Sequence, residues 1–377
     1  MEGLGLYVHI PFCQSRCRYC DFNTYAGLEG LFETYVRALL REIGLAGPAP
    51  VSTVYIGGGT PTVLPLSSLI QILEAIQEHF SLAPGAEVSI EANPGTVEAG
   101  TLAALRQHGV NRLSLGVQSF ADDELRLLGR IHTAEQAAAA LDAARQAGFD
   151  NVSLDLIFGL PGQSLADWRF SLERALEIEP EHLSLYALSV EAGTPLARDI
   201  ARGHLPLPDP DLAAEMYELA AEMDAAAGYL HYEISNWARG AGRQCRHNLI
   251  YWRNQPYLGL GAGAHSWQGR RRWANAAAPD EYARRLAAGD SALAEEETIS
   301  PELERGETMM MGLRLVDEGV PVGPFRRRFG LDPRDHYRDE IAELAELGLL
   351  EVDDERLRLS PRGRLLGNQV FAQFLPL

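Results

Sequence analysis

Short apolar runs alternate with longer stretches of helical period along the first 230 residues of the chain. Apolar runs bounded by turn residues are typical of buried strands, and apolar residues spaced three and four apart are typical of helices. Such helical stretches are residues 32–44, 66–80, 133–148 and 165–178. The strands that the pattern predicts are residues 6–10, 53–56, 87–91, 112–117, 151–157 and 182–188.

Strand–helix units in series predict a parallel sheet with right-handed crossovers. The predicted units are too few for a closed barrel of the usual kind. We therefore expect an α/β fold whose main part is a partial (β/α)6 barrel. A doubly wound parallel sheet is the alternative.

The pattern changes after about Gly228. HYEISNWARG predicts one more strand and a turn, and a segment rich in glycine and aromatic residues follows. Later, two helical stretches precede LLEVDDERLRLSPRGRLL, which predicts a hairpin and a final helix. Helices followed by a two-stranded wing predict a smaller, mainly α, winged-helix-like domain. The expected division is a barrel over residues 1–230, a connecting segment over 231–297, and the C-terminal domain over 298–377, with helices at 302–313 and 335–347.

The net charge of the chain limits the classes of molecule that it is expected to bind. Lys and Arg number 33 against 52 Asp and Glu, so the formal net charge is −19. This balance disfavours general binding of nucleic acid or of anionic membranes. No apolar run is long enough to span a membrane, and the opening MEGLGLYVHIPFC has no basic stretch of a secretory signal. We expect a cytoplasmic protein, in which closely spaced cysteines indicate a metal or redox site rather than disulfides.

Three of the four cysteines, Cys13, Cys17 and Cys20, form a CxxxCxxC triplet directly after the first predicted strand. Thiolates select zinc or iron–sulfur clusters. A structural zinc site needs four ligands, usually as two close pairs, and could be completed here by Cys245 or His9. In a four-iron cluster, three thiolates leave one iron free for a small molecule. The triplet lies at the strand ends where barrel active sites gather.

Other strand ends carry polar residues. GGGTPT follows the second strand, and its glycines let the backbone approach a ligand closely and expose amides. Glu91, Gln118 and Asp155 lie at or near the ends of the next three strands. Each alone could be a satisfied structural group, because a buried charge is costly without a partner. Together around one mouth they are typical of a ligand pocket.

The triplet, with Tyr19 before its last cysteine, resembles the hallmark of the radical S-adenosylmethionine (SAM) superfamily. The resemblance implies that Cys13, Cys17 and Cys20 hold a 4Fe–4S cluster and that SAM chelates the free iron through its amino and carboxylate groups. One-electron reduction of SAM then yields a 5′-deoxyadenosyl radical. In such proteins the cofactor carries the chemistry, and the protein supplies position and exclusion of water.

The same resemblance implies a set of SAM contacts. GGGTP resembles the loop that meets the SAM amino group, and two tyrosines resemble contacts to adenosine. An arginine suits the SAM carboxylate because its planar fork binds both oxygens, and carboxylates suit ribose hydroxyls. The implied residues are Tyr7, Tyr19, Gly58, Gly59, Thr60, Glu91, Gln118, Arg130 and Asp155.

The strings YVHIPFC, GGGTPT, GVQSF and DLIFGLPGQ narrow the resemblance to the oxygen-independent coproporphyrinogen III oxidase group. That group contains the oxidases and the HemW-type heme chaperones. Phe22 stands where the oxidases have a further cysteine, and the longer N-terminal extension of the oxidases does not precede Cys13. RHNLIYW carries the HNxxYW motif of the HemW type in His247, Asn248, Tyr251 and Trp252. These features favour the HemW type.

The implied function is a heme chaperone that binds heme and a SAM-associated 4Fe–4S cluster and delivers heme to acceptor hemoproteins, respiratory ones among them. A neutral imidazole can ligate heme iron, so His247 is the expected ligand, with His265 and Cys245 as rivals. A core histidine packed beside aromatic residues is the alternative for His247. We expect no nucleic acid and no membrane contact except through a partner; a homodimer is left open.

Two enzyme hypotheses compete with the chaperone. An oxygen-independent oxidase would decarboxylate the propionates of coproporphyrinogen III with the same SAM site, although Phe22 argues against it. A nucleic-acid-modifying radical enzyme would use the C-terminal domain, and the acidic chain without a basic stripe disfavours it.

Overall fold

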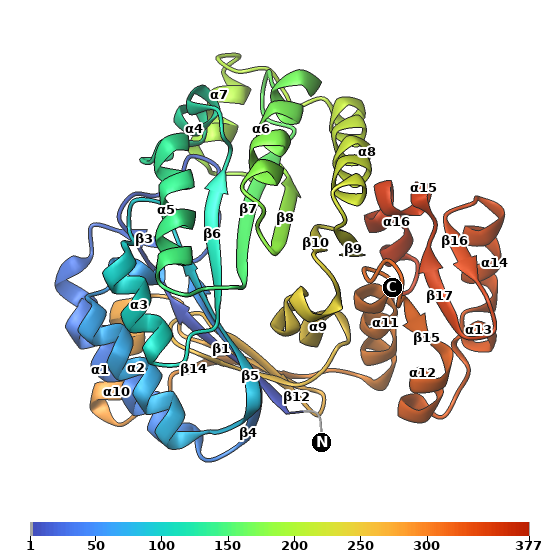
Figure 1. Ribbon diagram of the computed structural model, residues 1–377. Helices are drawn as coiled ribbons and strands as arrows, with labels where there is room; N and C mark the ends of the chain where they lie inside the picture. The colour runs from blue at the N-terminus through green and yellow to red at the C-terminus, as the bar shows by residue number, and fades with distance from the viewer. Residues whose placement is uncertain (1–2, 377) are drawn as a thin grey trace.

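The computed structural model describes residues 3–376, so residues 1, 2 and 377, at the ends of the predicted ranges 1–230 and 298–377, lie outside the described residues. A twelve-stranded sheet with helices on its outer side forms the larger part of the molecule, and a smaller helical domain lies beside it (Figure 1). No helix among residues 3–376 is both long enough and apolar enough to cross a membrane.

Six parallel strands form the central part of the sheet in the order in which they occur along the chain. Because the order never reverses, the doubly wound alternative is wrong and the partial (β/α)6 barrel is confirmed. The strands are β1 (Leu4–Ile10), β4 (Pro50–Gly58), β5 (Ser81–Ala92), β6 (Arg112–Gln118), β7 (Val152–Phe158) and β8 (His182–Ala187).

Amphipathic helices cover the outer face of these strands (Figure 1). Two of them start at a capping box, in which Thr133 and Ser164 accept hydrogen bonds from Gln136 N and Asp167 N. The crossover helices are α1 (Phe32–Ala46), α2 (Leu66–His79), α3 (Ala99–Gln107), α4 (Asp122–Leu128), α5 (Ala134–Gln146) and α6 (Leu165–Glu177), and α7 (Pro195–Ala201) and α8 (Pro210–Ala226) follow the last parallel strand.

Alternation along the strands separates the core from the lumen of the barrel. In β6, Leu113 and Leu115 point outward into the hydrophobic core, while Ser114 and Gln118 line a cavity inside the barrel. Successive side chains of a strand point to opposite faces, so one strand serves both purposes. Closed barrels usually fill the inside with branched apolar side chains. Here the inward positions are largely polar, and a cavity remains.

Further strands extend both edges of the parallel sheet. Beyond β1, the next strand pairs in parallel and three more follow in antiparallel order; beyond β8 there is an antiparallel pair. The segment 231–297 thus lies largely within the sheet, and its limits as a domain stay a prediction. The added strands are β11 (Tyr257–Leu260), β12 (His265–Gln268), β13 (Arg271–Asn275), β14 (Leu293–Thr298), β10 (Asn236–Ala238) and β9 (Leu230–Glu233).

The helix α9 (Arg246–Trp252) carries HNxxYW and lies at the floor of the barrel (Figure 1). The backbone N–H groups of Arg246 and His247 each donate to the carboxylate of Glu87 in β5, both at 3.0 Å. A carboxylate at a helix N-terminus satisfies donors that have no partner inside the helix. This contact fixes the motif against the inner face of the sheet.

The C-terminal domain has its own hydrophobic core and a three-stranded sheet, which confirms the winged-helix-like fold. It joins the barrel through β9, where Val316 N donates to Tyr232 O at 3.0 Å. Its elements are α11 (Pro301–Gly312), β15 (Val320–Pro321), α12 (Val322–Phe329), α13 (Pro333–His336), α14 (Arg338–Glu346), β16 (Leu350–Val352), β17 (Arg356–Leu359), α15 (Pro361–Leu365) and α16 (Gly367–Ala372).

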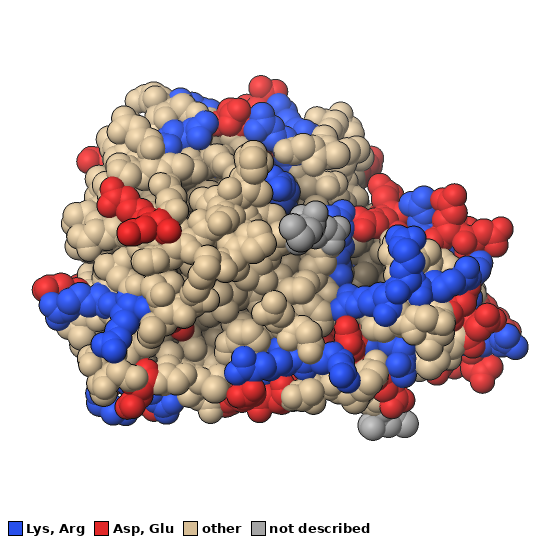
Figure 2. All heavy atoms as spheres, turned by 90° about the horizontal axis from the view of Figure 1, so that it is seen from below, with Lys and Arg blue, Asp and Glu red and all other residues tan. Residues whose placement is uncertain are grey.

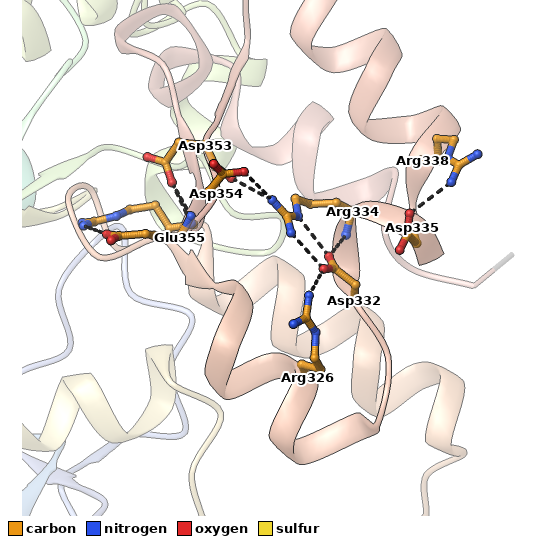
Figure 3. Close-up of polar contacts among 9 residues, drawn as sticks. Arg326, Asp332, Arg334, Asp335, Arg338, Asp353, Asp354 and Glu355 are labelled. Atoms are coloured by element: carbon orange, nitrogen blue, oxygen red, sulfur yellow. Dashed lines mark hydrogen bonds and ion pairs between the residues drawn. The ribbon is translucent and has the colours of Figure 1, made fainter.

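Two of the three consecutive arginines at positions 326–328 form ion pairs with acidic residues. Asp332 caps α13 and contacts both Arg326 and Arg334, and Arg334 reaches Asp354 in the hairpin turn at 3.2 Å (Figure 3). Hydrogen bonds from Arg334 hold the pKa of Asp332 below its usual range. Arg328 pairs with Glu304 at 2.8 Å. Figure 2 accordingly shows basic and acidic side chains interspersed over the face seen from below.

Candidate functional site

A cavity of about 540 Å³ opens inside the barrel at the carboxyl ends of the parallel strands. This main cavity brings together residues as far apart along the chain as Cys13 and Asn248. Tyr7 and His247 line neighbouring cavities instead. The predicted residues along its wall are Cys13, Cys17, Tyr19, Cys20, Gly58, Gly59, Thr60, Glu91, Gln118, Arg130 and Asp155.

The cysteine loop follows β1 and is held at both ends. After β1, the short strand β2 (Phe12–Cys13) pairs with β3 (Tyr25–Ala26), which closes the loop. The three thiols are free and half-buried. Each has a polar neighbour: Thr60 Oγ1 lies 3.8 Å from Cys13 Sγ, Arg130 Nη1 3.3 Å from Cys17 Sγ, and Thr24 Oγ1 3.7 Å from Cys20 Sγ.

The zinc alternative for this loop does not fit the arrangement. Among residues 3–376, no three His, Cys, Asp or Glu side chains are placed to hold one metal ion. Cys245 is fully buried and its Sγ lies 3.7 Å from Glu87 Oε1. The ring of His9 contacts Tyr7 Oη at 2.8 Å and Asn23 O at 3.0 Å. In a four-iron cluster each thiolate binds a different iron, so its sulfurs need not converge on one point.

The glycines at the end of β4 are required by close packing against β1 and β2. A Cβ on Gly59 would lie 2.4 Å from Phe12 O, and a Cβ on Gly58 would lie 2.4 Å from the ring of His9. The amides of Gly58 and Gly59 donate to Glu91 Oε2 at 3.0 Å and to Ile10 O at 2.8 Å. The expectation that these amides are exposed to a ligand is therefore wrong. The loop still borders the main cavity, so its part in SAM binding stays a prediction.

Two carboxylates face the main cavity, Glu91 from β5 and Asp155 from β7, with β6 between them. Glu91 accepts hydrogen bonds from Tyr55 Oη at 2.7 Å and from Gly58 N at 3.0 Å. Burial raises the pKa of Glu91 to about 7. Asp155 accepts a hydrogen bond from Ser114 Oγ at 3.1 Å. Burial raises the pKa of Asp155, although the neighbouring serine hydroxyl groups and Arg112 act in the opposite direction. Both carboxylates are thus partnered and remain accessible to hydroxyl donors of a ligand.

Arg130 connects the cysteine loop to the strand ends. Its Nη2 donates to Asn93 Oδ1 at 2.5 Å and to Gly116 O at 2.6 Å, and Asn93 Nδ2 donates to Thr60 Oγ1 at 2.7 Å. Sequence reasoning did not single out Asn93, although its place two residues after Glu91 in IEANP was a usable signal. The guanidinium is therefore fixed beside Cys17 before any ligand binds.

Gln118 ends β6 with a backbone φ of +70°, a value that residues other than glycine seldom adopt. Such conformations persist only where the surrounding structure enforces them, and they gather at functional sites. The register of β6 against β7 shifts just before Gln118. The shift turns the side chain of Gln118 to the wall of the main cavity.

The HNxxYW helix meets the main cavity through Asn248, which lines it together with the cysteines. His247 lies deeper and is 1% exposed. Its Nδ1 lies 2.8 Å from Thr53 Oγ1 and its Nε2 lies 2.9 Å from Tyr251 Oη. Burial, with a smaller effect of Arg112, lowers the pKa of His247 to about 3. His247 is thus a neutral imidazole with both nitrogens engaged, and its part in heme binding stays a prediction.

Two side cavities adjoin the main one, and Glu91 lines all three. One, of about 360 Å³, lies against α9 and is lined by Tyr7, His247, Tyr251 and Trp252. The other, of about 440 Å³, lies between β1, the cysteine loop and the turn from β11 to β12. Its wall includes the exposed side chains of Phe22 and His265.

Comparisons with known proteins agree with this architecture. The radical SAM superfamily matches residues 7–175, and the HemN C-terminal domain matches residues 299–366. The heme chaperone HemW of Mycobacterium tuberculosis is 42% identical, over 99% of this chain and 95% of its own length. HemW of Bacillus subtilis is 39% identical over 98% of both chains. This chain belongs to the HemW family of radical SAM proteins.

A solved structure of a related enzyme supports the fold of this HemW-family chain. Coproporphyrinogen III oxidase (HemN) from Escherichia coli, described as a radical SAM enzyme, superposes with a TM-score of 0.84 at 27% identity. The match covers 99% of this chain and 90% of the oxidase. Membership of the radical SAM superfamily implies a 4Fe–4S cluster and SAM. The three free thiols on one cavity wall fit that implication.

Several residues of the main cavity in this HemW-family chain escaped the sequence interpretation. They share one property: most occupy inward positions of the barrel strands, alternating with buried apolar residues. A search for polar residues at alternate strand positions would have found them. They are Tyr55, Arg112, Ser114, Ser184 and Tyr186, with Asn93 from the loop after β5.

Proposed function

We propose that the chain is a heme chaperone that carries a 4Fe–4S cluster with SAM, binds heme, and delivers it to acceptor hemoproteins, respiratory ones among them. The observation that carries the proposal is Phe22. It stands where the oxidases have a further cysteine, and its side chain is 66% exposed at the rim of the main cavity. The position of Asn248 in the same wall supports a role for HNxxYW beside the cluster.

Cys13, Cys17 and Cys20 would hold the cluster, because they are free thiols on one wall of the main cavity. When bound, cluster and SAM together supply one-electron chemistry. Arg130 is placed to bind the SAM carboxylate, since Asn93 and Gly116 O already orient its guanidinium. The protein therefore supplies a charged, oriented donor next to the thiols.

The remaining predicted contacts surround the same space. Glu91 and Asp155 would accept hydrogen bonds from ribose hydroxyls, with Gln118 beside them. Tyr19 borders the main cavity, whereas Tyr7 lies behind Glu91, 6.3 Å from Tyr55 between ring centroids. We infer that Tyr7 acts through the wall of the cavity rather than by facing the cluster. Gly58, Gly59 and Thr60 would form the wall next to the SAM amino group.

The test is anaerobic. The cluster is reconstituted in the full chain, SAM and dithionite are added, and hemin binding is followed by absorbance while coproporphyrinogen III is followed by chromatography. We expect stoichiometric heme binding and unchanged coproporphyrinogen III. A triple variant with Ser at positions 13, 17 and 20 is the control for cluster loading. Absence of heme binding by the loaded chain would refute the chaperone.

A second candidate, the coproporphyrinogen III oxidase, is favoured by the superposition with the E. coli oxidase over almost the whole chain. It uses the same predicted SAM contacts. The SAM-derived radical would take a hydrogen atom from each substrate propionate, and release of carbon dioxide, with one electron passed to a one-electron acceptor added to the assay, would leave a vinyl group. The same experiment separates the two functions. Conversion of coproporphyrinogen III that requires SAM and disappears in the triple Ser variant would establish the oxidase.

A further inference from the structure

We propose that the side cavity between β1, the cysteine loop and the β11–β12 turn binds the heme, and that His265 supplies the ligand to its iron. We call this space the His265 cavity; it is lined by Tyr7, His9, Phe22, Asn23, Gly58, Glu91, Tyr251, Tyr257, Gly263 and His265. The proposal rests on the heme-chaperone function and names the place and the residue that perform it.

Availability of a ligand atom selects His265 among the three rivals. Heme iron takes an imidazole nitrogen only when that nitrogen has a free lone pair. His247 has one ring nitrogen against Thr53 and the other against Tyr251, and Cys245 is fully buried. The His265 side chain is exposed at the cavity wall, and within residues 3–376 its imidazole has no hydrogen-bond partner.

Aromatic side chains give this cavity walls suited to a flat apolar ring. Tyr251 and Tyr257 lie edge to face with their ring centroids 4.8 Å apart, and the largely exposed Phe22 lines the same cavity. Aromatic faces pack well against extended π-systems. The volume of about 440 Å³ is typical of small-molecule sites. A partly exposed position also suits a cargo that must leave again.

Local backbone geometry presents His265 at this wall. The strand β12 approaches β11 so closely that a Cβ on Gly259 would lie 2.1 Å from His265 O. Ser266 Oγ accepts a hydrogen bond from Gly259 N at 2.8 Å. Gly263, in the turn, has a φ of +73°, and a Cβ there would lie 2.3 Å from Asn23 Nδ2. Glycines at these positions hold the first residue of β12 against the cysteine loop.

The cysteine loop forms the other wall, which relates the heme site to the cluster. Asn23 Nδ2 donates to Ala262 O at 3.2 Å and to Ala277 O at 3.0 Å, which connects the cysteine loop to the β11–β12 turn and to the segment after β13. Phe22 lines both the main cavity and the His265 cavity. This position gives Phe22 a purpose in a chaperone: it is a hydrophobic partition between the SAM region and the heme.

The deciding experiment is a hemin titration of the full, cluster-loaded chain and of single-residue variants, followed by the Soret band. For His265→Ala we expect affinity to fall at least about tenfold, together with a shifted Soret maximum, because the iron loses its axial nitrogen. Free imidazole should restore the Soret position of this variant. His336→Ala, at an exposed position in the C-terminal domain, is the matched control and should bind like the parent chain.

The outcomes separate this proposal from the function on which it rests. A parent chain that binds no heme refutes the chaperone itself. A parent chain that binds heme while His265→Ala keeps both its affinity and its Soret maximum overturns the assignment of His265 alone. His265→Met gives a second reading, because a thioether ligand moves the Soret band without removing the ligand. An unchanged band in that variant would equally exclude His265.

Phe22→Ser tests the wall independently of the ligand. We expect a lower heme affinity with an unchanged Soret position and an unchanged iron content, because Phe22 contacts the porphyrin in the proposal and binds no metal. The residue is 66% exposed, so its removal should leave folding intact. Heme affinity equal to that of the parent chain would show that the porphyrin lies elsewhere.

Discussion

Arg130 places Nη1 3.3 Å from Cys17 Sγ and, with the other terminal nitrogen of the same guanidinium, donates to Asn93 and to Gly116 O. A guanidinium held rigidly beside Cys17 offers a directed donor to an anionic ligand. One side chain thus couples the cysteine loop to the ends of β5 and β6.

Replacing this arginine should weaken SAM binding. For Arg130→Met in the reconstituted chain we expect SAM affinity to fall about tenfold or more, because a hydrogen bond to a charged group contributes about 1.5–3 kcal/mol. Equilibrium dialysis with SAM measures the loss, and iron content is measured alongside. Arg126→Met, at a surface residue that pairs with Asp123, is the control. Equal SAM affinity in the Arg130 variant would remove this residue from the SAM site.

The close approach of β1 and the loop after β4 predicts a strong asymmetry between two glycines. In Gly59→Ala the new methyl group would lie 2.4 Å from Phe12 O, so the loop must shift. We expect a loss of about 1–3 kcal/mol in the free energy of unfolding, as for other overpacked sites. Gly30→Ala, with nothing within 4 Å of the added carbon, should change stability little. Denaturant unfolding compares the two, and equal stability would contradict the packing described here.

Asp224 predicts a pH-dependent stability. The side chain of Asp224, in α8, is fully buried, and neither of its carboxylate oxygens has a hydrogen-bond partner among the described residues. Burial raises its pKa to about 8, well above the value of about 3.9 in an unfolded chain. The folded state therefore retains a proton that the unfolded state loses, and stability falls as pH rises from about 4 to 8.

Asp224→Asn should remove that dependence. We expect the variant to be more stable than the parent chain at pH 8 by on the order of a few kcal/mol, with a smaller difference at pH 5, since the amide does not ionise. Thermal unfolding of both proteins at the two pH values provides the measurement. A difference in melting temperature that does not change with pH would show that Asp224 stays ionised when the chain is folded.

His247 predicts a structural effect that can be separated from heme binding. His247→Ala leaves Thr53 and Tyr251 without their shared partner, and a buried unsatisfied polar group costs about 1–3 kcal/mol. The folded-state pKa of about 3 lies below the usual value, so this contribution is present above about pH 6.5 and is lost as pH falls. The stability gap between parent and variant should therefore narrow from pH 7 to pH 5. Urea titrations at both values test this, and a constant gap would mean that the imidazole is not held neutral.

The periodic part of the fold could be predicted from sequence, and so could the edge in HYEISNWARG, where β9 and β10 form; the strands β11 to β14 beyond β1 could not. Each of the six apolar runs became a strand, because burial on one face and alternation along the run act locally. The strand β14 has the sequence LAEEET, which carries no apolar alternation. It pairs with β13, where Arg271 and Arg272 contact Glu296 and Glu297, so its strand conformation depends on a tertiary partner.

The candidate site was likewise predicted in part from the sequence. The cysteine spacing and the residues at strand ends identified most of the main cavity before the structure was known. The environment of His247 was expected only as the alternative, a core histidine beside aromatic residues. Tyr251 lies one turn away on the same helix, but Thr53 meets His247 only after α9 folds into the barrel. The exposed amides expected for GGGTPT were likewise wrong, since the glycines serve packing against Phe12 and His9.

The alternation of polar and apolar positions along the barrel strands has an evolutionary consequence. Outward residues such as Leu113 and Leu115 maintain the scaffold, while inward neighbours such as Ser114 face the lumen and contribute no side chain to the hydrophobic core. Selection can therefore rewrite the interior without disturbing the layer that keeps the chain folded. Two lineages can therefore diverge in the molecule that they bind or convert while they keep the same fold, and the shared fold alone is then a poor guide to their functions.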